Sequence, residues 1–303
     1  MATRKAASSR AIHPAQAQHE IHDLEAVITA DVTRALEEDI GAGDRTAALV
    51  PAKAQALAHV ITRQDCVLAG TAWFERCYSE LDPDSEIFWH FKEGARVPAG
   101  AQLCEIEGNA RALLTAERAS LNFLQTLSGV ATRTRIFADA VKGTKARVFD
   151  TRKTLPGLRR ALKYAVTVGG GQNHRIGLYD GILIKENHIM AAGGVTPALQ
   201  AAFKAAPEGV FVQIEVETLD QLREALAAGC KLILLDNFTS ARMKQAVDIA
   251  RTKGNRGTEL EASGGITLKN VRRYAETGVQ RISIGTLTKD IEAVDLSMRF
   301  HLK

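Results

Sequence analysis

Cationic and acidic side chains follow short apolar runs in the second half of the chain, and the two kinds come in order. Arg152 and Lys153 lie directly after the first run, and Lys185 after the second. Carboxylates follow at the ends of the third and fourth runs, as Glu215 and Asp236. A guanidinium can bind carboxylate or phosphate oxygens through two parallel hydrogen bonds, and a lysine adds a mobile point charge. This order predicts a pocket for a small molecule with several anionic groups.

These residues also have ordinary structural interpretations. Adjacent basic residues such as Arg152 and Lys153 often lie in a solvated loop, and Glu215 and Asp236 could simply form ion pairs with the cations. The position of the basic pair directly after a predicted strand favours a binding site over a solvated loop. The two carboxylates, if they lie beside a phosphate, could also hold Mg²⁺ directly or through water.

His174 and Arg175 add to the same predicted pocket. They end a polar stretch, residues 169–175, that has neither a helical nor a strand period. A single histidine is usually structural, but this setting favours a function. The three glycines of the stretch lack the G-x-G-x-x-G spacing of a dinucleotide-binding turn, so a nicotinamide cofactor is not predicted.

Glycines come last in the series. Ser263, Gly264 and Gly265 follow the fifth apolar run, and Gly285 follows the sixth. Backbone N–H groups at such strand-to-helix turns commonly bind a phosphate in barrel enzymes. Either turn alone could be ordinary, but together they predict a phosphate site. Because no histidine-rich or cysteine-rich ligand set and no nucleophile motif occurs, neither a transition metal nor covalent catalysis is predicted.

The elements that position these residues alternate between strand and helix about six times from residue 148 to residue 284. Such alternation predicts a parallel sheet, either a closed barrel or an open doubly wound sheet. A period of two places Gln213 with Glu215, and Glu261 with Ser263, on polar faces of their strands. Inward carboxylates fit a barrel mouth better than a sheet buried on both faces. We therefore expect an incomplete β/α barrel of about six parallel strands.

The first part of the chain has a different rhythm and predicts a smaller α+β domain. A helix begins near Ile21, short strands follow, and helical patterning covers residues 110–141 with an expected interruption near Ser128 and Gly129. A half-buried strand at residues 294–300 is expected to return to this domain. The predicted domains are residues 20–128 with 290–303, and residues 129–289, after a disordered leader at 1–19 for which a transit peptide is the alternative.

Composition excludes several classes of protein. The 303 residues are 46% hydrophobic, 24% charged and 5% aromatic, as in ordinary globular proteins. The net charge of +4 owes much to the leader, so a nucleic-acid partner is not expected. No apolar run is long enough to span a membrane. The four cysteines form no C-x-x-C pair, which favours a reducing cytoplasm.

The sequence resembles the quinolinate phosphoribosyltransferases, also called carboxylating nicotinate-nucleotide pyrophosphorylases. The similarity runs in order from about residue 20 to the C-terminal end. It rests on LLTAER (113–118), LNFLQ (121–125), DTRKT (150–154), NHR (173–175), KENH (185–188), LDNF (235–238), EASGG (261–265) and on ED with GDRT in residues 38–46.

The resemblance implies a pentosyltransferase of NAD biosynthesis. It would transfer phosphoribose from phosphoribosyl pyrophosphate to quinolinate, giving nicotinate mononucleotide, diphosphate and carbon dioxide, with Mg²⁺ as cofactor. Quinolinate would be bound by Arg118, Arg152, Lys153, His174 and Arg175. The phosphoribosyl donor would be bound by Lys153, Lys185, Glu215, Asp236, Ser263, Gly264, Gly265 and Gly285.

The resemblance also implies which residues are catalytic and how the chain assembles. Lys153, Glu215 and Asp236 would take part in catalysis, and the two acids would hold the metal directly or through water. Arg118 would reach the site of a neighbouring subunit, so that a homodimer is required, with higher assembly left open. Two alternatives remain: a relative that transfers phosphoribose to nicotinate without decarboxylation, and a non-catalytic barrel that only binds anions.

Overall fold

The computed structural model describes residues 23–251 and 257–303. The predicted leader at residues 1–19 therefore lies outside the described residues. The chain forms two compact units, and it passes between them more than once. The barrel unit comprises residues 139–152, 172–251 and 257–284, and the antiparallel unit comprises residues 23–138, 153–171 and 285–303. The domain boundaries predicted from the sequence, residues 20–128 with 290–303 and residues 129–289, remain a prediction.

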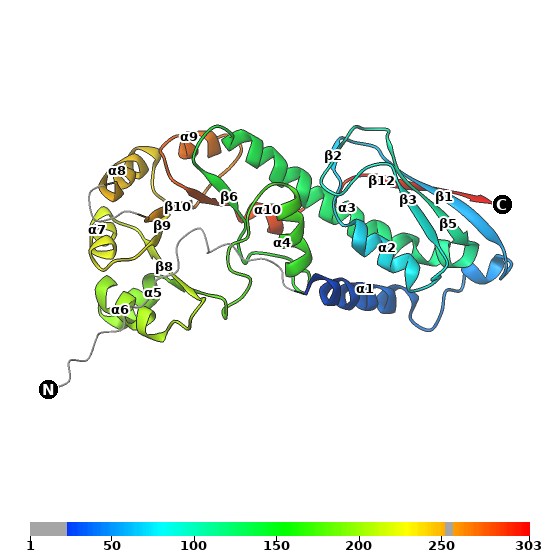
Figure 1. Ribbon diagram of the computed structural model, residues 1–303, viewed down its shortest axis with the longest axis horizontal. Coiled ribbons are helices and arrows are strands. Elements are labelled where there is room, and N and C mark those ends of the chain that lie inside the picture. The colour runs from blue at the N-terminus through cyan, green and yellow to red at the C-terminus, as the bar shows by residue number, and fades with distance from the viewer. Residues whose placement is uncertain (1–22, 252–256) are drawn as a thin grey trace. The chain divides into compact units, whose positions relative to one another are not determined.

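The barrel unit contains six strands in one parallel sheet, in the order β6-β11-β10-β9-β8-β7. Its elements are β6 (Arg147–Phe149), β7 (Gly181–Ile184), α5 (Glu186–Ala192), α6 (Val195–Ala205), β8 (Phe211–Val216), α7 (Leu219–Ala227), β9 (Leu232–Asp236), α8 (Ser240–Ala250), β10 (Glu259–Ser263), α9 (Val271–Ala275) and β11 (Arg281–Ser283). Helices α6, α7 and α8 follow one another along the outer side of the curved sheet (Figure 1).

Strands β6 and β7 are the two edges of this sheet, so the barrel is incomplete, as the sequence predicts. A single bridge between Phe149 and Gln172 continues the pairing beyond β6. The strands are short and largely buried because apolar side chains from both faces fill the core. Ile233 and Leu235 of β9 are fully buried, as is Ile282 of β11. Burial of each such side chain contributes about 1.5–3 kcal/mol to folding.

The antiparallel unit contains a four-stranded sheet in the order β12-β1-β5-β3 and a separate pair of two-residue strands. Its elements are α1 (Leu24–Ile40), a 3-10 turn η2 (Ala47–Leu49), β1 (Gln55–Thr62), β2 (Cys66–Val67), α2 (Thr71–Ser79), β3 (Glu86–Trp89), β4 (Arg96–Val97), β5 (Gln102–Asn109), α4 (Arg159–Val168), α10 (Thr286–Lys289), β12 (Leu296–Leu302) and most of α3 (Ala110–Val141). No helix in the described ranges is long and apolar enough to cross a membrane.

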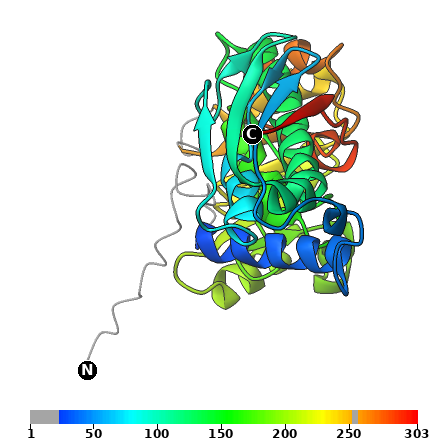
Figure 2. The ribbon, with the colours of Figure 1, turned by 90° about the vertical axis from the view of Figure 1, so that its right-hand side faces the viewer.

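The C-terminal strand returns to the first domain, as the sequence predicts. Strand β12 pairs antiparallel with β1 from Ala56 opposite Leu302 to Thr62 opposite Leu296, and the two run side by side in Figures 1 and 2. On the inner face Ala56 is completely buried, and α2 packs here through Tyr78, whose hydroxyl lies 3.5 Å from the sulfur of Met298. A pattern of alternating apolar residues therefore located this strand correctly.

Helix α3 corrects one expectation, because it is continuous through Ser128 and Gly129. The glycine does not end the helix. It allows close packing, since a β-carbon at Gly129 would collide with the backbone carbonyl of Glu292. Ser128 also serves the packing, because its hydroxyl accepts a hydrogen bond from the backbone N–H of Ala69. The residues that resembled a helix break are therefore a contact surface within the antiparallel unit.

Candidate functional site

The predicted site residues of the barrel unit lie at one edge of its parallel sheet. Glu215 lies near the end of β8 and Asp236 ends β9, while Lys185 directly follows β7. Ser263 ends β10 in register with Asp236. Because parallel strands end at a common edge, the fold brings together residues that are far apart in sequence. The sheet therefore positions an array of charged side chains at its carboxyl edge.

The cationic part of this array includes two arginines that repel each other. Arg175 is nearly buried, and its guanidinium donates a hydrogen bond of 2.9 Å to the carbonyl of Gly181. Burial lowers the pKa of Arg175, and the charge of Arg152 lowers it further, against the opposite effect of Asp180. An anion bound beside the two arginines would relieve both the desolvation and the repulsion.

The acidic part of the array meets the cationic part at one ion pair. Lys185 Nζ lies 3.6 Å from Glu215 Oε2, so Glu215 does form an ion pair with one of the cations. Burial raises the pKa of Glu215, Lys185 lowers it, and the charges of Asp236 and Glu186 raise it again. Carboxylates therefore outnumber cations around Glu215, which is a suitable setting for a divalent cation.

Protein side chains alone would not complete a metal site here. Within residues 23–251 and 257–303 there is no group of three or more His, Cys, Asp or Glu residues that could hold an ion. Glu215 and Asp236 supply two carboxylates. Mg²⁺ commonly takes one or two protein carboxylates and completes its octahedron with water and substrate phosphates, so the pair fits Mg²⁺ better than a zinc site.

The turn after β10 requires glycine for its backbone conformation and for its packing. Gly264 and Gly265 have positive φ angles of 94° and 59°, and a β-carbon at Gly264 would collide with Asn237. Nothing lies within 4 Å of a β-carbon placed on Gly265. Gly285, the N-cap residue of α10, has φ −67° and therefore needs no left-handed backbone. The first turn requires glycine for its conformation, whereas the second does not.

His174 lies in a chain of hydrogen bonds that begins beside the cations. Its backbone N–H donates to Asp150 Oδ1 at 2.8 Å, and its ring Nδ1 accepts the backbone N–H of Arg175, also at 2.8 Å. Ring Nε2 lies 2.8 Å from Oε1 of Gln213, and Nε2 of Gln213 donates to Glu261 Oε2 at 2.9 Å. The loop holding His174 has no regular structure, so these bonds fix its position.

Glu261 is the buried centre of this chain. Its carboxylate accepts hydrogen bonds from Arg281 Nε at 2.9 Å and from the hydroxyl of Ser283, and the Arg281 guanidinium lies 3.7 Å from the centre of the Phe149 ring. Burial alone would raise the pKa of Glu261, but His174, the charge of Arg281 and the hydrogen bonds of Ser283 and Gln213 lower it. The carboxylate is therefore ionised although its side chain is completely buried.

The role of this buried group was not predicted from the sequence. The period of two places Gln213 on the polar face that also holds Glu215, and Glu261 on the face that holds Ser263. Only the folded structure shows that these side chains meet, because β9 lies between their two strands. The only feature of the sequence that could have indicated a role for Arg281 is its charge at the start of an apolar strand.

Three predicted site residues belong to the antiparallel unit. Lys153 follows Arg152 directly, and its backbone carbonyl accepts a hydrogen bond from Thr288. Gly285 is the N-cap residue of α10 and directly follows Ile284. Arg118 lies exposed on α3, and it forms no ion pair with any residue in the described part of the chain. An unpaired, exposed arginine on a rigid helix can bind an anion outside its own unit.

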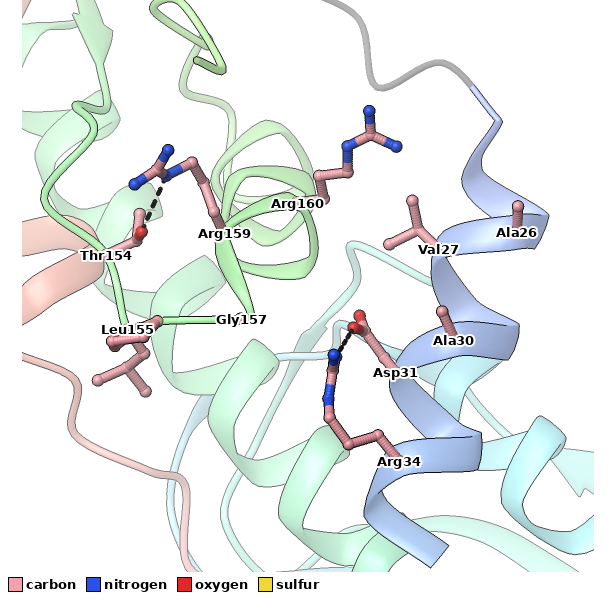
Figure 3. A pocket seen from close by; sticks show the side chains of 11 residues that line it. Ala26, Val27, Ala30, Asp31, Arg34, Thr154, Leu155, Gly157, Arg159 and Arg160 are labelled. Carbon is pink, nitrogen blue, oxygen red and sulfur yellow. Dashed lines mark hydrogen bonds and ion pairs between the residues drawn. The ribbon is translucent and has the colours of Figure 1, made fainter. Parts of the chain in front are cut away.

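A cavity of about 450 Å³ in the antiparallel unit was not predicted. Figure 3 shows Asp31 and Arg34 of α1 on one side of it, with Thr154 and Arg159 on the other. Arg34 forms a 2.6 Å ion pair with Asp31, whose other oxygen accepts the indole N–H of Trp73. Burial raises the pKa of Asp31, and Trp73 and Arg34 offset this only in part.

Comparison with known proteins assigns both parts of the chain to one family. Residues 130–299 match the C-terminal domain of quinolinate phosphoribosyl transferase, and residues 44–128 match its N-terminal domain. A probable carboxylating nicotinate-nucleotide pyrophosphorylase of Bacillus subtilis is 42% identical over 86% of this chain and 89% of its own. The Mycobacterium leprae enzyme of that name is 42% identical over 88% of this chain and 95% of its own.

A solved structure agrees with these matches. The nicotinate-nucleotide pyrophosphorylase of Francisella tularensis is 43% identical, with a TM-score of 0.86 over 91% of this chain and 96% of that chain. The likeness therefore covers both units.

Proposed function

We propose that this chain, which belongs to the quinolinate phosphoribosyltransferase family, transfers phosphoribose from phosphoribosyl pyrophosphate to quinolinate in NAD biosynthesis. The products are nicotinate mononucleotide, diphosphate and carbon dioxide. The observation that supports this most directly is the grouping of charges in the barrel unit: Arg152 and Arg175 repel each other, and Glu215 lies among further carboxylates beside Lys185. Such a site suits two anionic substrates and a divalent cation.

Quinolinate, with two carboxylates, is assigned to the arginine side of the site. Arg152 and Arg175 can each bind a carboxylate through two parallel hydrogen bonds, and Lys153 adds a third charge. His174 holds the backbone of Arg175 through its ring nitrogen. Because burial and the charge of Arg152 lower the pKa of Arg175, a bound carboxylate would stabilise the charged form of Arg175.

The phosphoribosyl donor is assigned to the acidic side and the glycine turns. Lys153 and Lys185 would bind diphosphate oxygens, and Glu215 and Asp236 would face the ribose hydroxyls. The 5′-phosphate would lie at the backbone of Ser263, Gly264, Gly265 and Gly285. The open space at Gly265 is consistent with a ligand close to the backbone.

Mg²⁺, when bound, would neutralise the diphosphate leaving group. Glu215 and Asp236 would hold the ion directly or through water, because the negative charge that raises the pKa of Glu215 is relieved by a cation. Lys153 lies in the same motif as Arg152 and is assigned to both substrates, so it would lie where the new bond forms.

The protein contributes mainly position and charge. Two polyanions repel each other, so a site that holds both needs several fixed cations at once. The pyridine nitrogen attacks C1 of the ribose as diphosphate leaves, and the alkylated nitrogen becomes positive. That charge stabilises the carbanion left when carbon dioxide departs, so the substrate supplies its own electron sink and no organic cofactor is needed.

The active assembly is proposed to be a homodimer in which Arg118 of one subunit completes the quinolinate site of the other. The exposed position of Arg118, without an ion pair in the described ranges, supports this assignment. A cytoplasmic location is part of the proposal, and the four free, buried cysteines are consistent with a reducing compartment.

One assay tests the function and separates its rivals. The protein is mixed with quinolinate, phosphoribosyl pyrophosphate and Mg²⁺, and nicotinate mononucleotide and carbon dioxide are measured. We expect the two products in equal amounts, and no product after Mg²⁺ is removed by a chelator. Turnover of nicotinate but not quinolinate would indicate the non-decarboxylating relative, and binding without turnover would indicate an anion-binding protein.

A further inference from the structure

We propose that Gln213 and Glu261 are positioning residues that hold His174 as the neutral tautomer with its proton on Nε2. Through His174 they fix the backbone of Arg175. The tautomer follows from geometry alone, whereas its effect on quinolinate binding rests on the proposed function.

The two ring nitrogens of His174 have opposite roles. Nδ1 lies 2.8 Å from the backbone nitrogen of Arg175, which can only donate, so Nδ1 must accept and carries no proton. Nε2 lies 2.8 Å from Oε1 of Gln213, which can only accept, so Nε2 carries the proton. The cationic form, which needs a proton on both nitrogens, would break the bond to Arg175.

The assignment of a proton to Nε2 of His174 depends on the orientation of the Gln213 amide. Glu261 fixes that orientation. An amide can be turned by 180° without changing its shape, so its hydrogen-bond partners must decide which atom is oxygen. Glu261 is ionised and only accepts, and it lies 2.9 Å from the nitrogen of Gln213. The oxygen of Gln213 therefore faces His174. Both Gln213 and Glu261 are completely buried, so water does not compete for these bonds.

Glu261 is itself fixed by two donors from the neighbouring strand β11. Arg281 and Ser283 both donate to its carboxylate, and the Arg281 side chain is completely buried against Phe149. A buried charge is tolerated only when it is paired and hydrogen-bonded. Arg281 supplies the compensating charge, so Glu261 stays ionised without a proton from the histidine.

Charged groups of both signs lie around His174. Arg175 lies on one side and Asp150 holds its backbone N–H, while Glu261 Oε1 lies 3.7 Å from Nε2 and the other oxygen of Glu261 pairs with Arg281 at 2.9 Å. The Phe211 ring covers an edge of the imidazole at 5.8 Å between centres. Since both ring nitrogens bind protein atoms, His174 orients Arg175, and the arginines supply the positive charge for the substrate.

Nuclear magnetic resonance of the full-length protein labelled with ¹⁵N-histidine tests the tautomer. The chain has eight histidines, and a His174→Gln variant identifies the signal that belongs to His174. We expect one protonated and one unprotonated ring nitrogen, unchanged from about pH 6 to about pH 8, where an ordinary histidine titrates. A doubly protonated ring, or a proton on Nδ1, would overturn the proposal.

A Gln213→Met variant tests the positioning role, because methionine keeps the volume and removes both hydrogen bonds. We expect the His174 signals to change to a mixture of tautomers or to titrate. Because a buried donor loses its partner, kcat/KM for quinolinate should fall roughly tenfold or more, mainly through KM. If that variant does not fold, Gln213→Asn keeps the amide but shortens its reach, and the same change is expected.

The matched control is Gln280→Met, which removes a half-buried glutamine bound to the backbone of Leu260. It should leave the His174 signals and the KM for quinolinate unchanged. Unchanged His174 signals in both Gln213 variants would refute the positioning role. A protein without quinolinate turnover whose His174 signals behave as described would refute the proposed function and leave the positioning role intact.

Discussion

Two groups of like charge lie in the barrel unit. Arg152 lowers the pKa of the nearly buried Arg175, and Asp236 raises that of Glu215. Each repulsion costs free energy in the absence of ligand, and each is relieved by an ion of opposite charge. A dicarboxylate and a divalent cation would relieve one each, so the proposed substrates stabilise the protein as well as react on it.

Arg152→Ala should lower kcat/KM for quinolinate by roughly 100-fold or more, the scale of losing a positioned electrostatic group. Steady-state kinetics with quinolinate varied at saturating phosphoribosyl pyrophosphate measure this. Arg160→Ala is the control, since Arg160 is an exposed arginine beside the cavity of the antiparallel unit. Equal quinolinate kinetics in the two variants would remove Arg152 from the proposed site.

For single residues, the sequence predicts which side chains follow a strand. It does not predict which of these side chains contact one another. Lys185, Glu215 and Asp236 are placed at the sheet edge correctly because a strand end can be recognised from its apolar run. The contact between Gln213 and Glu261 joins β8 and β10, which are separated by β9, and a pattern within one strand does not contain it.

Helix α3 shows how a residue type can mislead about an element. Glycine usually weakens or ends a helix, and Gly129 lies in the middle of one. Glycine is required at this position because the backbone of Glu292, more than 160 residues later in the chain, lies close to it. The short helix α5 was missed for a related reason, because Glu186, Asn187 and His188 have no apolar period.

Gly129→Ala should destabilise the protein by about 1–3 kcal/mol, because an added methyl group must displace backbone rather than a side chain. The free energy of unfolding in urea measures the change. Thr126→Ala, at a partly exposed position of the same helix, should change stability by less than about 0.5 kcal/mol. Equal stability of the glycine variant and wild type would contradict the close packing.

Asp31 on α1 should make stability depend on pH. Burial raises its pKa above the ordinary value, so the folded protein binds this proton more tightly than the unfolded chain does. Its contribution to stability is therefore lost as pH rises from below the ordinary carboxyl pKa toward neutrality. Asp31→Asn should thus gain stability relative to wild type between about pH 4 and pH 7.

Thermal midpoints of wild type and the Asp31→Asn variant across this range measure the effect. Asp84→Asn, at an exposed position of the same unit, serves as the control. A difference between the Asp31 variant and wild type that does not change with pH would show that the carboxylate is not penalised by burial.

The proposed dimer predicts a recovery of activity that would not occur if each site were built from a single chain. Arg118→Ala and Arg152→Ala should each inactivate every site of their own homodimers. In a hybrid dimer, one site receives intact Arg118 from the partner and keeps its own Arg152. Mixing the two variants after reversible dissociation should restore about a quarter of wild-type activity, because half of the dimers are hybrids with one intact site.

The same mixture also shows how the assignment could fail. If Arg118 served its own chain, each site of a hybrid would lack one arginine and no activity would return. Size-exclusion chromatography before and after mixing shows whether subunits exchange, so that an absence of recovery can be interpreted. Because Arg118 is exposed on α3, we expect it to act in the site of the partner chain.

The pairing of β12 with β1 has a consequence for biosynthesis. Strand β12 follows the whole barrel unit in the chain, so the ribosome makes it after all six strands of the parallel sheet. Until then β1 pairs only with β5, and its other side has unpaired N–H and carbonyl groups. The nascent protein must therefore keep this bare strand from joining other chains while the rest of the polypeptide is translated.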